Sequence, residues 1–222
     1  MKAGLDLEIP VPLALGKACD SFPWPWSIYR WIEGETATIE GIGDLELFAA
    51  DLASFLNELQ RLDGTGGPEP GKDNFFRGGN LSIYDLETRK CLDALSEEID
   101  GDWAGGVWKE ALTSRFRGEP VWLHGDMATG NLLTRGGRLA AVIDFGLCAV
   151  GDPACDLVLA WNLFEGRSLE VFRRNLRVDE SCWTRAKGWA LWKALLMLLQ
   201  RKSPEEVLQA ERTLAHLKAD SL

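Results

Sequence analysis

The feature that most constrains the fold of this chain is a short segment in which polar residues bracket two apolar arms. Residues 124–133 read HGDMATGNLL, and residues 141–146 read AVIDFG. Arg135, Gly136 and Gly137 lie between the arms, and a glycine-rich turn between two apolar runs predicts a β-hairpin. Apolar side chains would anchor this hairpin and hold the polar residues together at its open end.

The rest of the sequence is dominated by helical patterns. Between residues 44 and 64, apolar residues recur at steps of three and four, with Asp44 as a cap and Gly64 as a stop. Two further helical segments precede the hairpin and four follow it, the last with Ser203 as its cap. Residues 9–34 have no helical period and predict a strand, a turn and a strand. We therefore expect an α+β fold that is mostly helical.

Charge and cysteine content exclude several classes of partner. The 24 basic and 34 acidic residues give a net charge of −10, without any block of like charges. Nucleic acid and anionic membranes are therefore poor partners. The acidic excess favours solubility, with attraction of a cationic substrate as the alternative. The five cysteines form no CxxC pair, and the N-terminus lacks the apolar run of a signal peptide, so we expect a cytoplasmic protein.

The polar residues at the open end of the hairpin have the chemistry of a metal site. Asn131 precedes the first arm and Asp144 ends the second, so two oxygen donors face each other across the hairpin. Mg²⁺ prefers carboxylate, amide oxygen and water, which makes this pair a candidate magnesium site. Asp126 would then lie nearby as a base. The alternative is structural, because a His and an Asp beside a turn usually hold the loop.

Three motifs in order resemble those of a known family. Residues 124–131 read HGDMATGN, residues 143–146 read IDFG, and residues 151–161 read GDPACDLVLAW. The first two have the spacing of the catalytic loop and the metal-binding aspartate of kinases. All three together resemble the aminoglycoside phosphotransferase family, relatives of protein kinases that include choline kinase and other small-molecule kinases. The segments PWPWSIYRWIEGE and FFRGG are also similar, so the resemblance covers nearly the whole chain.

The resemblance implies a role for each matching residue. Asp126 would orient and deprotonate the hydroxyl group of the acceptor, and Asn131 and Asp144 would bind Mg²⁺. His124 would brace the loop, and Asp156 would hold it from the following helix. The implied reaction transfers the γ-phosphoryl group of ATP, or of another nucleoside triphosphate, to a hydroxyl group of a small molecule.

The resemblance also implies a division of the chain. Residues 1–34 would be a short β remnant of the N-terminal lobe with the hinge, and residues 35–222 the helical C-terminal lobe of a protein-kinase-like fold. Tyr29, Arg30 and Trp31 fall where the hinge of the family offers backbone groups to adenine.

Most of the family's small lobe has no counterpart in the sequence. Fewer than thirty residues precede the hinge, too few for a glycine-containing loop over the phosphates, and Lys2 and Lys17 lie in no V-A-I-K context. Without that loop and a lysine, ATP would be poorly positioned and exposed to water. A fragment whose start is missing, a degenerate relative and the large lobe alone are all open explanations. The rival to a weakly active phosphotransferase is a non-catalytic binding module or an inactive fragment.

Tryptophans are frequent in the helices after the hairpin. Trp161, Trp183, Trp189 and Trp192 lie where the family builds its acceptor pocket. An aromatic cage for a cationic acceptor is one interpretation, but the three-residue step from Trp189 to Trp192 also fits core packing, which we expect. The resemblance therefore identifies the acceptor only as a small molecule with a hydroxyl group.

Overall fold

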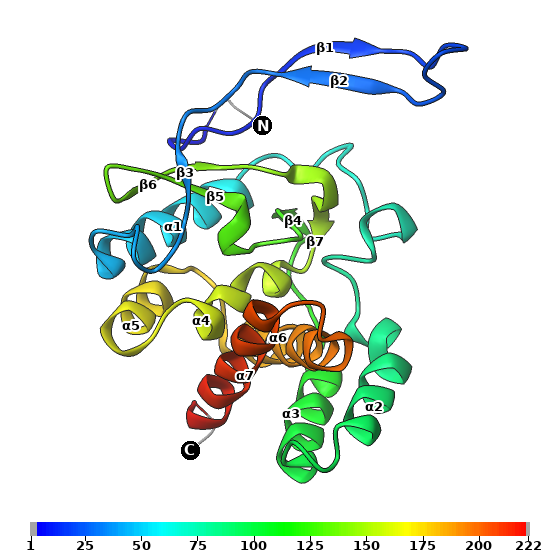
Figure 1. Ribbon diagram of the computed structural model, residues 1–222, viewed down its shortest axis with the longest axis vertical. Coiled ribbons are helices and arrows are strands. Elements are labelled where there is room, and N and C mark those ends of the chain that lie inside the picture. Colours follow the sequence, from blue (N-terminus) through cyan, green and yellow to red (C-terminus); the bar gives the residue numbers. More distant parts are fainter. Residues whose placement is uncertain (1–3, 221–222) are drawn as a thin grey trace.

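The computed structural model describes residues 4–220, and helices make up most of the body of the molecule (Figure 1). The α-helices are α1 (Leu45–Gln60), α2 (Asp85–Ala94), α3 (Gly101–Thr113), α4 (Leu159–Asn162), α5 (Gly166–Asn175), α6 (Glu180–Gln200) and α7 (Pro204–Ala219). The strands are β1 (Pro12–Gly16), β2 (Trp26–Tyr29), β3 (Glu35–Thr36), β4 (Val121–Leu123), β5 (Leu132–Arg135), β6 (Arg138–Val142) and β7 (Ala149–Gly151). Short 3₁₀ helices connect them: η1 (Lys72–Asn74), η2 (Leu81–Tyr84), η3 (Thr129–Asn131), η4 (Phe145–Leu147) and η5 (Pro153–Val158). The expected α+β, mostly helical fold is confirmed.

The strands pair into small antiparallel sheets. β1 pairs with β2, β4 pairs with β7, and β5 lies between β3 and β6. In the β5–β6 hairpin, Gly136 and Gly137 form a two-residue turn with φ angles of 61° and 77°. Both angles lie in the left-handed region, which glycine enters without steric penalty. The expected hairpin is confirmed, although Arg135 is paired within the strand and is not part of the turn.

The first long helix begins as expected and ends earlier. Asp44 Oδ1 accepts hydrogen bonds from the backbone N–H groups of Glu46 and Leu47, at 2.9 and 3.0 Å. These bonds satisfy two donors that lack partners in the first helical turn. The expected stop at Gly64 is wrong, because the N–H of Arg61 already turns back to carbonyl oxygens of the last turn. The apolar face of α1 is buried and packs on α5, β4 and β6.

The segment after the hairpin is less regular than its sequence pattern indicates. The first of the four helical segments expected after the hairpin is instead the 3₁₀ helix η5 followed by the single turn α4. All six residues of η5 are buried, and the segment packs on α6 and β4. Tertiary packing, rather than helix propensity, therefore sets its path.

Helix α6 is the centre of the helical body (Figure 1). It packs against α2, α3, α7 and η5. The four tryptophans considered above are buried, with exposed fractions of 0% for Trp161, 7% for Trp183, 2% for Trp189 and 6% for Trp192. The expected core role of these side chains is confirmed. None of the helices among residues 4–220 has both the length and the apolar character that a membrane span requires.

The β1–β2 hairpin projects beyond this body (Figure 1). Its base is attached on both sides of the β5–β6 hairpin: Glu8 bonds to the backbone of β6, and β3 pairs with β5. Arg135 Nη2 also donates to Glu8 Oε1 at 3.1 Å and to the carbonyl oxygen of Glu33 at 2.7 Å. The expected strand, turn and strand are confirmed, and the division of the chain after residue 34 stays a prediction.

The projecting hairpin carries much exposed apolar surface. Trp31 is 81% exposed and Leu15 is 82% exposed. A two-stranded hairpin of this kind has few neighbours to bury its side chains.

Candidate active site

The polar motif forms a loop between two anchored strands. Residues 124–131 connect β4 to β5, and each strand is paired with another, β4 with β7 and β5 with β6. Leu123, Leu132 and Val142 at the ends of these strands are fully buried. Because the apolar anchors are fixed in the core, the polar side chains between them are held in place.

His124 is completely buried beneath this loop. Its Nε2 lies 2.8 Å from the carbonyl oxygen of Ile143, and its Nδ1 accepts the backbone N–H of Asp126 at 3.2 Å. A carbonyl oxygen only accepts, so Nε2 is the donor in the contact with Ile143. His124 therefore links the loop to the strand that leads to Asp144.

Asp156 holds the same loop from η5. Its carboxylate oxygens accept the backbone N–H groups of His124 and Gly125, at 2.6 and 2.8 Å, and the side chain is almost completely buried. Burial raises the pKa of Asp156. Gly125 has a φ of +86°, and a Cβ at this position would lie 2.1 Å from the carbonyl oxygen of Leu147. The tight turn therefore requires glycine at the second position of the motif.

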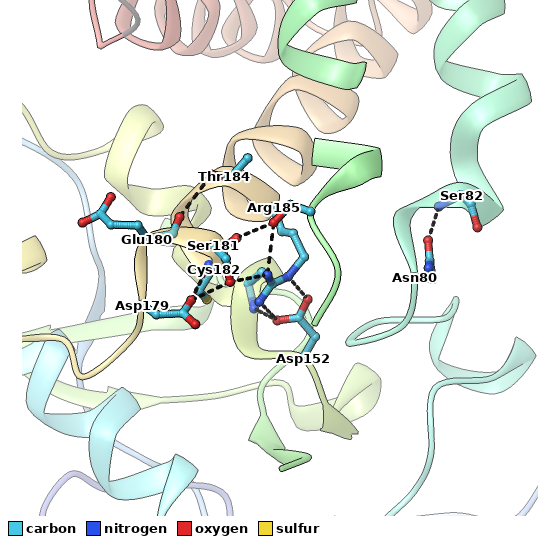
Figure 2. Close-up of polar contacts among 11 residues, drawn as sticks. Asn80, Ser82, Asp152, Asp179, Glu180, Ser181, Cys182, Thr184 and Arg185 are labelled. Carbon is cyan, nitrogen blue, oxygen red and sulfur yellow. Dashed lines mark hydrogen bonds and ion pairs between the residues drawn. The ribbon is translucent and has the colours of Figure 1, made fainter. Parts of the chain in front are cut away.

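A buried ion pair fixes η5 itself (Figure 2). Arg185 of α6 donates through Nε and Nη2 to both carboxylate oxygens of Asp152, at 2.6 and 3.1 Å, and the two side chains are 6% and 5% exposed. Nη1 of Arg185 also bonds to Ser181 and Ser114. Through this pair α6 holds residues 151–153, the Gly-Asp-Pro segment at the start of η5, and η5 in turn carries Asp156.

Asp126 lies at the surface end of the loop and is half-buried. Lys193 Nζ donates to Asp126 Oδ1 at 2.9 Å, and the two side chains are 31% and 35% exposed. Burial alone would raise the pKa of Asp126, but the positive charges of Lys193 and Arg77 outweigh it and lower the pKa. Asp126 is thus a carboxylate at neutral pH, and it can accept a hydrogen bond from a hydroxyl group.

Asn131 and Asp144 are brought together at the open end of the hairpin. The carbonyl oxygen of Asn131 accepts the N–H of Ile143 at 2.9 Å, so Asp144 follows directly after this contact. Asn131 Nδ2 donates to the carbonyl oxygen of Asp126 at 2.8 Å, and this bond fixes the orientation of the amide. Its Oδ1 is therefore the side-chain atom that could bind a cation.

Asp144 has an uncommon backbone conformation. Its φ and ψ are 62° and 65°, in the left-handed region, and its exposed carboxylate lies 3.4 Å from the N–H of Gly146. Strain of this kind at a non-glycine residue is concentrated at functional sites. One carboxylate and one amide oxygen suit Mg²⁺ that is also bound by phosphate and water. The residues from 4 to 220 contain no group of three or more acidic, His or Cys side chains placed to hold a metal ion by themselves.

Tyr29, Arg30 and Trp31 lie at the base of the projecting hairpin. Tyr29 pairs with Pro12, and the N–H of Arg30 donates to the carbonyl oxygen of Val11 at 3.0 Å. Within the described chain, no hydrogen bond or ion pair joins these three residues to the loop of Asp126. Because the N–H of Arg30 is used inside the hairpin, a backbone contact with adenine would fall to other groups of this segment.

Two basic residues near Asp126 were not identified from the sequence. Lys193 lies within an apolar run of the sequence, WALWKALLMLL, where a single lysine is a signal of a polar contact. Arg77 belongs to the FFRGG segment, and its guanidinium carbon lies 5.3 and 4.9 Å from the ring centroids of Trp189 and Trp192. No local pattern indicates that a loop arginine will stack on helix α6.

The sequence matches the family model described as the phosphotransferase enzyme family, APH, over residues 2–195. The chain belongs to this family. The match includes every residue of the loop, Asp144 and Lys193, and it confirms the resemblance inferred from the motifs.

Solved structures of the same fold agree with this assignment. The GDP complex of wild-type aminoglycoside 2'-phosphotransferase-IIIa is 21% identical, with a TM-score of 0.68, over 100% of this chain and 79% of that chain. The streptomycin–ATP complex of APH(2")-IIa is 16% identical, with a TM-score of 0.53, over 98% and 76%. Macrolide 2'-phosphotransferase MphH from Brachybacterium faecium, as the apoenzyme, is 19% identical, with a TM-score of 0.54, over 97% and 74%. At these identities the neighbours show the kinase-like fold, and the chain spans about three quarters of each of them.

Proposed function

We propose that this member of the phosphotransferase family transfers the γ-phosphoryl group of ATP, or of another nucleoside triphosphate, to a hydroxyl group of a small molecule. The observation that carries the proposal is the position of Asp126, an ionised carboxylate on a loop held by His124 and Asp156, beside the pair Asn131 and Asp144. Neighbours of the same fold were solved with ATP and with GDP, which supports nucleotide use.

In this mechanism Asp126 positions the acceptor and receives its proton. The hydroxyl group donates a hydrogen bond to the carboxylate, which directs the oxygen lone pair toward phosphorus. The bond between that oxygen and phosphorus forms while the bond from phosphorus to the leaving diphosphate oxygen breaks. Because a lowered pKa makes Asp126 a weak base, it takes the proton late, once the hydroxyl oxygen has become acidic. Asp126 thus acts mainly by orientation.

Asn131 and Asp144 are the residues that would hold Mg²⁺ in this proposal. Bound magnesium neutralises charge on the phosphate groups of a nucleotide. The hydrogen bond from Asn131 Nδ2 to Asp126 couples the two parts of the site, because a shift of the amide would also move the loop. His124 and Asp156 support the loop without contacting the reactants.

Two further parts of the proposal concern the N-terminal segment and the location of the protein in the cell. Residues 1–34 would be the remnant of the N-terminal lobe, with Tyr29, Arg30 and Trp31 as the hinge near adenine. A cytoplasmic location agrees with nucleotide use and with the free state of the five cysteines.

One observation favours the rival function, a non-catalytic binding module. The β1–β2 hairpin presents exposed apolar side chains, among them Leu15 at 82% and Trp24 at 67%. Exposed apolar surface of this kind is typical of a site that binds another molecule. A chain that binds a partner there but turns nothing over would fit this observation.

Nucleotide consumption in the presence of mixed hydroxyl compounds tests the proposal. Wild-type protein and Asp126→Asn would be assayed with Mg·ATP, with Asp93→Asn as a matched control because Asp93 is an exposed aspartate of α2. Loss of the carboxylate is expected to lower turnover by roughly 10²–10⁴-fold while nucleotide affinity stays the same. Turnover that survives in Asp126→Asn would contradict the role proposed for Asp126, whereas absence of turnover from the wild-type protein would favour the rival.

A further inference from the structure

The projecting β1–β2 hairpin carries apolar side chains on both of its faces, and the two faces differ (Figure 1). Leu15 pairs with Ser27, and Ala14 pairs with Ile28. Because successive side chains of a strand point to opposite faces, Leu15 and Ile28 lie on different sides of the hairpin. The side of Leu15, which we call the leucine face, carries Leu13, Leu15 and Tyr29, with Trp31 at its base.

The leucine face is the more exposed of the two. Leu15 is 82% exposed and Trp31 is 81% exposed, whereas Trp26 and Ile28 of the opposite face are 44% and 49% exposed. Trp26 lies across Gly16, where an added Cβ would come within 1.8 Å of the indole ring. The opposite face is therefore partly covered by a side chain of the hairpin itself, and the uncovered apolar surface is concentrated on the leucine face.

The exposed apolar area is large enough for a stable interface. An aromatic side chain has roughly 150–250 Å² to bury, so the leucine face and the neighbouring Phe22 and Trp24 together offer roughly 750 Å² at their exposed fractions. The largest apolar patch of a typical monomer covers about 300–600 Å², and a standard protein–protein interface buries about 800 Å² on each partner. The hairpin therefore presents about as much apolar surface as one side of such an interface.

The hairpin segment carries no net charge, although the chain as a whole has a net charge of −10. Within residues 9–34, Lys17 and Arg30 balance Asp20 and Glu33. Two copies can therefore approach through their hairpins without local repulsion, whereas a basic partner would be attracted to the acidic body instead. The five residues of β1 alone span about 16 Å, and repulsion between the two bodies is screened over about 8 Å at physiological salt.

The polar tip of the hairpin argues against a membrane as the occupant of the leucine face. Lys17 and Asp20 lie in the loop between β1 and β2 and are exposed. A hairpin that inserts into a membrane would have to bury these two charges before its strands, which is unfavourable in hydrocarbon. The apolar side chains lie along the flank of the hairpin instead, where a second hairpin can pack.

We propose that the leucine face is the interface of a two-fold symmetric dimer of this chain, in which two hairpins pack face to face. A two-fold axis brings the same surface of each copy together, so the assembly closes at two copies and covers both leucine faces. The adenine contact proposed for residues 29–31 uses main-chain groups, which leaves the side chains of Tyr29 and Trp31 to the interface. The dimer does not depend on the proposed function, because it forms without nucleotide.

Sedimentation velocity of the 222-residue chain, without nucleotide, tests the dimer from about 1 to 100 µM, where interfaces of modest affinity dissociate. The mass is expected to reach that of two chains within this range. It should stay there in about 1 M NaCl, because salt does not screen an apolar interface. A monomer at every concentration overturns the proposal, and so does an assembly that keeps growing beyond two copies.

Substitutions by lysine locate the interface. Leu15→Lys places a charge in the leucine face and should weaken the dimer at least tenfold, whereas Ile28→Lys, on the opposite face, should weaken it less than threefold. The matched control is Leu208→Lys, at a 67% exposed position of α7, which should change nothing. Circular dichroism should show the same helical content for all three variants, since the replaced side chains are exposed. A dimer that survives Leu15→Lys, or that Ile28→Lys disrupts more strongly, contradicts this choice of face.

Cosedimentation with phosphatidylcholine vesicles tests the membrane as the alternative occupant. The wild-type chain is expected to stay in the supernatant as a dimer. If a monomeric chain binds the vesicles and Leu15→Lys abolishes that binding, the leucine face binds lipid and the proposal is wrong.

Discussion

Replacing Arg185 by methionine should be among the most damaging single changes in this protein. The guanidinium group of Arg185 makes two bonds to Asp152 and further bonds to Ser114 and Ser181, and both members of the ion pair are about 95% buried (Figure 2). Arg185→Met keeps the apolar volume but leaves the Asp152 carboxylate buried without its cation. Breaking a buried pair in this way costs about 3–5 kcal/mol, against a total stability of about 5–15 kcal/mol for a typical domain.

A double-mutant cycle would measure this contribution. The free energy of unfolding in urea would be followed by tryptophan fluorescence and circular dichroism for the wild-type protein, Arg185→Met, Asp152→Asn and the double variant. The double variant leaves no unpaired charge, so the coupling energy between the two positions should be about 1–3 kcal/mol. Arg185→Lys, which keeps the charge and loses the two-bond geometry, should fall between the wild-type protein and Arg185→Met.

A small change in the free energy of unfolding of Arg185→Met would contradict this prediction. If Arg185→Met lowers the free energy of unfolding by less than about 1 kcal/mol, the pair is not the desolvated contact that its geometry indicates. A coupling energy within about 0.5 kcal/mol of zero would show that the two residues act independently.

Two further predictions concern the backbone of the loop and the dependence of stability on pH. Gly125→Ala should destabilise the protein by at least about 2 kcal/mol in urea unfolding, because φ is +86° and the new Cβ would meet Leu147 O at 2.1 Å. The control Gly106→Ala, at an exposed site of α3 with open space, should instead stabilise by about 0.5–1 kcal/mol, and an equal loss in both variants would contradict the steric argument. Burial alone would raise the pKa of Asp220, but the Arg173 guanidinium at 2.6 Å outweighs it and lowers the pKa. Its contribution is therefore complete above the unfolded-state pKa of about 3.9 and is lost as the pH falls through the lower folded-state pKa. Asp220→Asn should flatten the loss of stability as the pH falls below about 3.9, and an unchanged slope would count against the pair.

The elements that could be predicted from the sequence are those that local chemistry determines. Apolar residues that recur at steps of three and four indicate the helix α1, and the side chain of Asp44 defines its start. Gly136 and Gly137 define the hairpin turn. Asn131 and Asp144 lie at the same end of the hairpin because Leu132 pairs with Val142 and the N–H of Ile143 donates to the carbonyl oxygen of Asn131. These features depend on contacts between residues close in the sequence.

The features that could not be predicted depend on contacts across the fold. The 3₁₀ path of η5 results from burial of all six of its residues on α6 and β4. The contact of Lys193 with Asp126 joins residues 67 positions apart, and Arg77 stacks on tryptophans more than 100 positions away. Sequence periodicity carries no signal for such pairs, so these contacts became visible only in three dimensions.

We propose above that Asn131 and Asp144 hold the metal of a bound nucleotide in this chain. Calorimetric titration of Mg·ATP into the wild-type protein and into Asp144→Asn, with Asp93→Asn as the control, tests it most directly. The account predicts binding by the wild-type protein and the control, and at least a tenfold loss in Asp144→Asn, which corresponds to about 1.4 kcal/mol. Equal binding by all three proteins, or no binding by the wild-type protein, would contradict the claim.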